Sequence, residues 1–198
     1  MKESVLCDFP ALMTEALTSR CVLAGHYLRR CKDILEIGGG RNPIDRYLVG
    51  EHESVTVIDP TISWLDTARS DGCAVLHVRA RLEEWWDAVS SATALRRSPR
   101  QSGLWDGVAM LGFEGWRHVP REIALELIGR ADRVVVEGAQ DHAGIREAMD
   151  EIDGLPGLEK VVDIASEYAG AGVPAEWQFR RRALRVYDRV GRETEKER

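Results

Sequence analysis

The sequence predicts a single α/β domain built around a doubly wound, mostly parallel seven-stranded sheet. Short aliphatic runs recur along the chain, segments of helical periodicity separate most of them, and three consecutive glycines follow the first run. Strands that alternate with helices form βαβ units, which lie parallel in one sheet. The 198 residues, 44% hydrophobic and 30% charged, suit one globular domain with a sizeable core, residues 1–198.

A helix is expected ahead of the first strand, over residues 10 to 30. Asp8 suits an N-cap and Pro10 the first helical turn. Four apolar residues then recur on one helical face: Leu17, Cys21, Ala24 and Leu28. Residues 1–32 are therefore interpreted as an N-terminal helical segment.

Strands and helices alternate from there until the tail. The expected strands are 33–37, 54–58, 74–78, 106–111 and 133–137, and the expected helices are 43–49, 62–70, 82–90, 121–129 and 143–152. Residues 158–164 and 183–190 look extended with no clear helix between them, which predicts a closing antiparallel pair. Residues 90–103 have the composition of a loop, and residues 191–198 are expected to be a frayed end.

Charge and composition argue against several classes of protein. The net charge of −6 argues against a dedicated nucleic-acid binder. The basic cluster Arg180, Arg181, Arg182 and Arg185 is interpreted as the solvated face of a strand, with a phosphate site as the alternative. The lack of an apolar span or signal-peptide pattern predicts a cytoplasmic protein without membrane contact. The four cysteines have no zinc or disulfide spacing, so no metal site is expected.

The glycines Gly38–Gly40 directly follow the first expected strand and predict a nucleotide-type binding site. Ligands of open α/β sheets lie outside the carboxyl ends of the strands. Asp59 ends the second expected strand about 20 residues later, where a carboxylate can accept hydrogen bonds from ribose hydroxyls. A dinucleotide is disfavoured because the third glycine of GxGxxG is missing and Pro43 removes an N–H donor. Glu36 instead suits a ligand with an ammonium group.

These two segments resemble the binding motifs of the class I S-adenosylmethionine-dependent methyltransferases. "ILEIGGG" is similar to the first motif of that family and "VTVIDPTISWL" to the second. The resemblance extends over most of the chain after Lys32. It implies the strand order 3-2-1-4-5-7-6 with an antiparallel last strand, and S-adenosylmethionine as the cofactor.

The resemblance also implies a set of cofactor-binding residues. They are Glu36, Gly38, Gly39, Gly40, Asp59 and Ile62. The glycine loop would line the amino-acid moiety of the cofactor, and Glu36 would support that end of the site. Asp59 would hold the ribose, and Ile62 would touch the adenine.

The sequence departs from the family pattern in two places. After the third expected strand it has Arg79 and Arg81 where the family offers an acid to the adenine amino group. The fourth expected strand ends without an NPPY-like motif, which weighs against methylation of adenine or glutamine nitrogens. The weakened third motif favours one alternative, a catalytically silent methyltransferase-like binding protein or partner subunit.

Methyl transfer depends mainly on in-line positioning, but a general base helps a hydroxyl or thiol acceptor. Possible bases near the carboxyl ends of the fourth and fifth strands are Glu114, His118, Glu137, Asp141 and His142. Glu114 and His118 are the candidate catalytic residues, and Trp116 is a candidate wall of a substrate pocket.

The sequence therefore predicts methyl transfer to oxygen or nitrogen of a small-molecule acceptor. Few segments could form a lid, so either the site is open to a modest substrate or a second subunit, as in a homodimer, completes it. Two further alternatives remain. An RNA methyltransferase is encouraged only by the arginine cluster, and an NAD-dependent oxidoreductase is disfavoured by Pro43 and by the missing Tyr-x-x-x-Lys pair.

Overall fold

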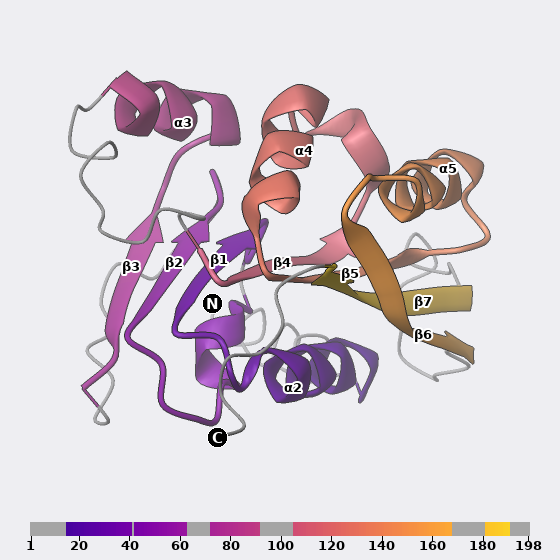
Figure 1. Cartoon of the computed structure of the whole chain (residues 1–198), viewed down its shortest axis with the longest axis horizontal. Coiled ribbons are helices and arrows are strands. Elements are labelled where there is room, and N and C mark those ends of the chain that lie inside the picture. The colour runs from indigo at the N-terminus through magenta and orange to yellow at the C-terminus, as the bar shows by residue number, and fades with distance from the viewer. Residues whose placement is uncertain (1–14, 41, 63–71, 92–104, 168–180, 191–198) are drawn as a thin grey trace, which may run out of the picture.

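The computed structural model describes residues 15–40, 42–62, 72–91, 105–167 and 181–190, which form a sheet covered by helices on both faces (Figure 1). The strands are β1 (Asp33–Ile37), β2 (Ser54–Ile58), β3 (Ala74–Val78), β4 (Gly107–Phe113), β5 (Arg133–Ala139), β6 (Leu158–Glu167) and β7 (Arg181–Arg189). Their order is β3-β2-β1-β4-β5-β7-β6, and β7 runs antiparallel to both of its neighbours. The predicted fold class and strand order are confirmed.

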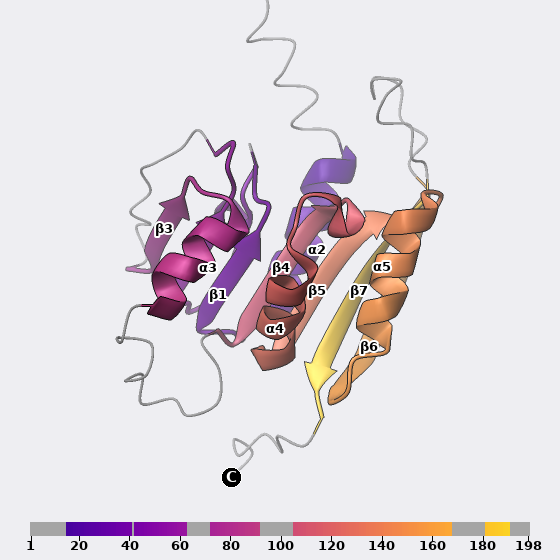
Figure 2. The same cartoon turned by 90° about the horizontal axis from the view of Figure 1, so that it is seen from above.

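Helices α3 (Leu82–Ser91), α4 (Arg121–Arg130) and α5 (Ala143–Asp153) cover one face of the sheet. Helix α2 (Glu15–Leu28) covers the other, as the two perpendicular views show (Figures 1 and 2). Two short 3-10 helices, η1 (Ile44–Arg46) and η3 (Gly115–Arg117), follow β1 and β4. Because both faces are covered, the central parallel strands are near-continuous aliphatic runs, which made them visible in the sequence.

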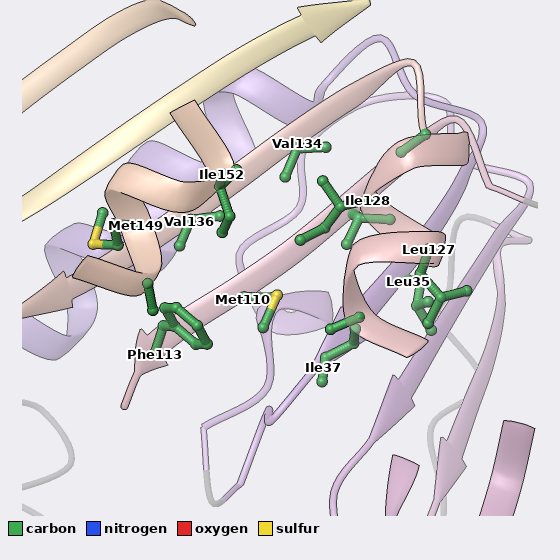
Figure 3. Close-up of a cluster of buried hydrophobic side chains, with 14 of the residues drawn as sticks. Leu35, Ile37, Met110, Phe113, Leu127, Ile128, Val134, Val136, Met149 and Ile152 are labelled. Atoms are coloured by element: carbon green, nitrogen blue, oxygen red, sulfur yellow. The ribbon is translucent and has the colours of Figure 1, made fainter. Parts of the chain in front are cut away.

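The larger core lies between the sheet and helices α3, α4 and α5. Close to β4 and β5, α4 contributes Leu127 and Ile128, and α5 contributes Met149 and Ile152, all at most 1% exposed (Figure 3). On the opposite face, Cys21, Ala24 and Leu28 of α2 are buried in a second cluster. The described part of α2 therefore buries the apolar face that its periodicity predicted.

The segment after the glycine loop is shorter than predicted. A helix over 43–49 was expected, but η1 is a single turn closed by a 2.8 Å bond from Tyr47 N–H to the carbonyl of Ile44. The expected loop 90–103 begins two residues too early, because α3 continues to Ser91. Residues 63–70 of the expected helix, 92–103 of the expected loop, and residues 1–14 and 191–198 lie outside the described residues.

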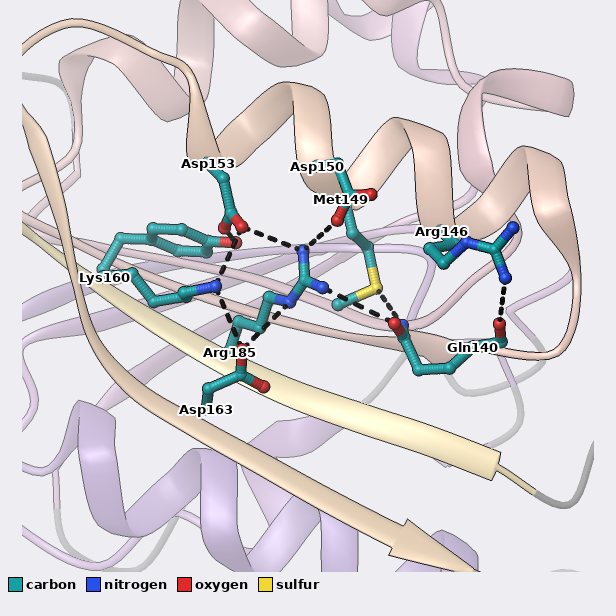
Figure 4. Close-up of polar contacts among 9 residues, drawn as sticks. Gln140, Arg146, Met149, Asp150, Asp153, Lys160, Asp163 and Arg185 are labelled. Atoms are coloured by element: carbon teal, nitrogen blue, oxygen red, sulfur yellow. Dashed lines mark hydrogen bonds and ion pairs between the residues drawn. The ribbon is translucent and has the colours of Figure 1, made fainter.

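The arginine cluster on β7 is not the solvated strand face that the sequence suggested. Arg182 is an internal ion-pair partner of Glu137, and Arg185 is only 7% exposed. Figure 4 shows Arg185 pointing toward Asp150 and Asp153 of α5. The prediction was wrong because these side chains meet acids of neighbouring elements, Arg182 that of Glu137 on β5 and Arg185 those of α5. Arg181 is exposed, and Arg180 lies outside the described residues.

Candidate functional site

The glycine loop leaves β1 with two residues in the left-handed region of backbone space. Gly38 has φ of 85° and Gly40 has φ of 55°, conformations that side chains rarely adopt. A Cβ placed on Gly38 would meet no atom within 4 Å, and one on Gly40 would meet only Asp59 Oδ2, at 3.8 Å. The loop therefore exposes bare backbone to an open space beside Asp59.

Glu36 holds this loop from inside the protein. Its side chain is buried, and its Oε2 accepts a 2.8 Å hydrogen bond from the N–H of Ile44 in η1. A Cβ on Gly39 would lie 2.7 Å from the same Oε2. Burial raises the pKa of Glu36 to about 8, against the opposing effect of the Ile44 hydrogen bond. Glu36 thus packs beneath the loop. This structural role accounts for the buried carboxyl without an ammonium group on the ligand.

Asp59 follows β2 at the same edge of the sheet. Its Oδ1 accepts hydrogen bonds from the backbone N–H and the side-chain hydroxyl of Thr61, both at 2.6 Å. These bonds fix the rotamer of the carboxylate, which is 9% exposed. The other oxygen, Oδ2, lies on the side of Gly40. This geometry brings the two predicted motifs together and fits a ribose placed over the loop.

Ile62 does not lie where the sequence suggested. Its side chain is fully buried in the core cluster on the α2 face of the sheet, so it leaves no surface for an adenine. An aliphatic residue that lines a ligand and one that fills a core look alike in a sequence, and here the core takes it. We therefore withdraw Ile62 from the candidate binding residues.

A second buried pair anchors the turn after the glycine loop. His77 Nε2 of β3 lies 3.3 Å from Asp45 Oδ1 of η1, and both side chains are at most 3% exposed. No sequence signal identified this pair, because its members are 32 residues apart. It ties η1 to the edge strand of the sheet.

The two candidate catalytic residues lie together at the carboxyl end of β4. Glu114 and His118 flank η3, and His118 Nε2 is 3.6 Å from Glu114 Oε2. Both side chains are largely exposed, at 62% and 66% respectively. Trp116 of η3 instead points to α5, donating a 2.8 Å hydrogen bond to Glu151 and packing edge-on against Phe113. We therefore do not retain Trp116 as a pocket wall.

Glu137, another possible base, is already engaged. Both of its oxygens accept hydrogen bonds from Arg182, and Oε2 also accepts one from the N–H of Gly112, at 2.9 Å. Arg20 Nη1 of α2 lies 3.4 Å from that same oxygen. Burial alone would raise the pKa of Glu137, but Arg182, with help from Arg20 and Gly112, lowers it below its usual value. This carboxylate stays ionised and bound.

Sequence reasoning missed Arg20. In the helical pattern of Leu17, Cys21 and Ala24 it occupies a position on the apolar stripe, three residues after Leu17 and four before Ala24. An arginine there must either snorkel to solvent or find an internal anion. An arginine on the apolar face of the predicted helix was the signal that could have identified Arg20.

The described part of the chain offers neither a metal cluster nor a membrane-spanning helix. Within it, no group of three His, Cys, Asp or Glu side chains could hold a metal ion. None of the described helices is long and apolar enough to cross a membrane.

Comparison with known proteins identifies the fold. No protein-family model and no curated protein matches the sequence. Solved structures do. An N-methyltransferase, NodS of Bradyrhizobium japonicum, solved with S-adenosyl-L-homocysteine, superposes with a TM-score of 0.57 at 13% identity over 91% of each chain.

Two further solved structures are similar to about the same extent. A Pyrococcus horikoshii protein, provisionally assigned as an RNA methyltransferase, has a TM-score of 0.57 at 12% identity, over 91% of this chain and 86% of its own. A Thermoplasma acidophilum protein has a TM-score of 0.55 at 16% identity, over 90% of this chain and 89% of its own. The chain therefore has the Rossmann-like fold of class I methyltransferases.

Proposed function

We propose that this protein is an S-adenosylmethionine-dependent methyltransferase that acts on oxygen or nitrogen of a small molecule. The observation that carries the proposal is the meeting of the glycine loop with Asp59. Gly38 and Gly40 turn bare backbone toward open space, and Asp59 Oδ2 lies next to Gly40 at the same sheet edge. Ligands of this fold class bind at that edge, beside the point where strand order reverses.

The residues present fit such a cofactor. Asp59 Oδ2 is available on the loop side to accept a ribose hydroxyl, while Oδ1 keeps the carboxylate oriented through Thr61. Glu36 holds η1 and thereby the loop. The cofactor, when bound, supplies an electrophilic methyl group. The chain has only to position the acceptor and to remove its proton.

For the proton, we propose the pair of Glu114 and His118. They lie at the end of β4, across the switch point from Asp59, and their exposure leaves them accessible to an acceptor. The carboxylate would orient the imidazole, as the acidic partner of a histidine base does in other enzymes. Glu137 is less suitable because its oxygens are occupied by Arg182 and Gly112.

Two alternatives are kept. A catalytically silent binding protein or partner subunit is favoured by Arg79 and Arg81, which stand after β3 where the family offers an acid. An RNA methyltransferase is favoured by the likeness to the Pyrococcus horikoshii protein. The arginines of β7 no longer encourage RNA binding, because Arg182 and Arg185 are held in internal ion pairs. A small acceptor is therefore the better proposal.

Calorimetric titration with S-adenosylhomocysteine tests the proposal. Asp59→Asn is the sharpest variant, because an amide oxygen can keep the Thr61 hydrogen bonds while the Oδ2 acceptor is lost. We expect micromolar binding by the wild type and at least ten-fold weaker binding by Asp59→Asn. The matched control is Asp87→Asn on the exposed side of α3, which should bind as the wild type does.

The same titration with NAD separates cofactor classes. Absence of S-adenosylhomocysteine binding by the folded wild type, or tighter binding of NAD, would overturn the proposal. If the cofactor binds but no acceptor is methylated in a screen of small hydroxyl and amine compounds, the silent alternative would be favoured. Binding to RNA that falls steeply with salt would favour the RNA alternative.

A further inference from the structure

The guanidinium of Arg20 is only partly hydrogen-bonded and ion-paired by neighbouring groups. Among the residues that the structure describes, this guanidinium has one hydrogen-bond acceptor, Glu137 Oε2, which lies 3.4 Å from Nη1, a long distance for such a bond. Its Nε is buried and has no hydrogen-bond partner. The side chain is 17% exposed, so the group is withdrawn from most of the solvent but still reachable. A guanidinium offers five donors, and buried charges are normally paired and fully hydrogen-bonded.

The acids around Arg20 do not complete its coordination. Glu137 already receives two hydrogen bonds from Arg182 and one from Gly112, so Arg20 only shares it. Burial raises the pKa of Glu36 to about 8, which leaves this carboxyl mostly protonated at neutral pH. Burial likewise raises the pKa of the adjacent Cys21 thiol to about 12. Neither group supplies a full negative charge.

The position of the guanidinium points to the substrate side of the site. A Cβ added to Gly112 would lie 2.8 Å from Arg20 Nη1 and 3.3 Å from its Cζ, so the guanidinium rests on bare backbone at the end of β4. Gly112 is on β4, whereas the glycine loop and Asp59 follow β1 and β2. The strand order reverses between β1 and β4, so Arg20 lies on the half of the sheet edge away from the ribose residue.

We propose that Arg20 binds a carboxylate of the methyl acceptor, which makes the substrate class a small carboxylic acid. The planar fork of arginine matches the two oxygens of a carboxylate. A bound carboxylate would complete the coordination that Glu137 provides only in part. A cationic acceptor would be repelled by the fixed guanidinium. This proposal rests on the proposed methyltransferase function and specifies its acceptor.

The test is calorimetric titration with pairs of probes that differ only in charge: acetate with acetamide, benzoate with benzamide, and phenylacetate with phenylacetamide. Inorganic phosphate is added as a second anion. Each is titrated with and without saturating S-adenosylhomocysteine. We expect at least one carboxylate to bind the wild type ten-fold or more tightly than its amide does. Arg20→Met should abolish that preference, and Arg20→Lys, which keeps the charge without the fork, should keep part of it.

The control is Arg130→Met, which removes the same charge from an exposed position on α4 and should leave the preference unchanged. Thermal unfolding shows whether each variant is folded, and Arg20→Lys carries the test if Arg20→Met is not. Equal binding of every carboxylate and amide, or tighter binding of phosphate than of any carboxylate, would overturn the assignment.

One further pair of titrations distinguishes the acceptor from the cofactor, which has a carboxylate of its own. S-adenosylhomocysteine carries the amino-acid moiety and 5′-methylthioadenosine lacks it. If Arg20→Met weakens only the first, Arg20 binds the cofactor and the acceptor proposal is wrong. If wild-type protein binds neither nucleoside, the proposed function fails, while the carboxylate titrations without nucleoside still test Arg20 on their own.

Discussion

Glu137 Oε2 accepts a hydrogen bond from the backbone N–H of Gly112 where β4 and β5 lose their register. Leu111 pairs with Glu137 and Phe113 with Gly138, so Gly112 is the extra residue of a β-bulge. A bulged residue loses its ladder partner, and here a buried carboxylate replaces it. The bulge thereby joins the end of β4 to the ion pairs with Arg20 and Arg182.

Gly112→Ala should destabilise the protein. Gly112 has φ of 70°, and an added Cβ would lie 2.8 Å from Arg20 Nη1. We expect the free energy of unfolding in urea to fall by about 1–3 kcal/mol. The control is Gly129→Ala in α4, where a Cβ meets no atom within 4 Å. That variant should be as stable as the wild type or more stable by about 0.5–1 kcal/mol. Equal stability of both variants would contradict the bulge described here.

Gly39→Ala should distort the glycine loop by contact alone. Gly39 does not have a positive φ, but its Cβ would lie 2.4 Å from Val57 Cγ1 and 2.7 Å from Glu36 Oε2. We expect a loss of about 1–3 kcal/mol in unfolding free energy, and S-adenosylhomocysteine binding weakened by ten-fold or more. Gly72→Ala is the control, with backbone strain at φ of 84° but no atom within 4 Å. It should cost some stability and leave the affinity unchanged; a lost affinity there would point to a general effect of unfolding.

Much of the fold could be predicted because buried parallel strands leave a plain aliphatic signature. The predicted bounds of β1, β2 and β3 agree with the structure residue for residue. The order of the strands came from the resemblance to methyltransferases, since periodicity carries no information on which strands are neighbours. The turn after the glycine loop was predicted less accurately. The segment after the loop was expected to be a helix, and only the single turn of η1 forms.

The site could be predicted only where its residues lie next to segments that the sequence itself identifies. Gly38 and Asp59 each follow a recognisable strand, and the parallel sheet brings them to one edge. Arg185 was misread because its partners Asp150 and Asp153 come more than 30 residues earlier, on another element. Ile62 was misread because aliphatic character does not distinguish a ligand wall from a core.

The stability of the protein should depend on pH through Glu36. Burial raises its folded-state pKa from 4.5 to about 8, so the folded state binds this proton more tightly than the unfolded state does. The contribution of Glu36 is therefore full below its unfolded pKa and declines as pH rises toward 8. Between pH 5.5 and 8 this loss is on the order of 3 kcal/mol. Glu36→Gln has no such proton, so its stability relative to the wild type should rise over that range.

Urea unfolding of both proteins at pH 5.5, 7 and 8.5 measures this difference. All other titrating groups are common to the two proteins, and their effects cancel in the comparison. Glutamine can still accept the hydrogen bond of Ile44 N–H, which limits the structural change. A difference that stays constant with pH would mean that Glu36 is ionised in the folded protein.

The last prediction concerns the ion pairs between Arg185 and three aspartates (Figure 4). Its Nη1 lies 2.9 Å from Asp150 and 3.3 Å from Asp153, and Asp163 is 3.6 Å from its Nε. Arg185→Met keeps most of the side-chain volume but leaves these carboxylates with less positive charge. The arginine is buried, but Asp150 and Asp163 are about half exposed, and solvent offsets part of the lost interaction. We therefore expect a loss of about 2–4 kcal/mol in unfolding free energy at pH 7. Arg181→Met, at an exposed position on the same strand, should change it by less than about 0.5 kcal/mol.

The pH dependence of that loss separates charge from packing. Burial alone would raise the pKa of Asp153, but hydrogen bonds from Lys160 and Tyr187 and the charge of Arg185 together lower it. A carboxyl with a lowered folded-state pKa stabilises the protein above its unfolded pKa, and this contribution is lost as pH falls. In Arg185→Met the pKa of Asp153 is lowered less, so the contribution of Asp153 to stability at pH 7 is already smaller. The difference between Arg185→Met and the wild type should therefore shrink from pH 7 to pH 3.5, whereas a loss due to packing alone would be the same at both pH values.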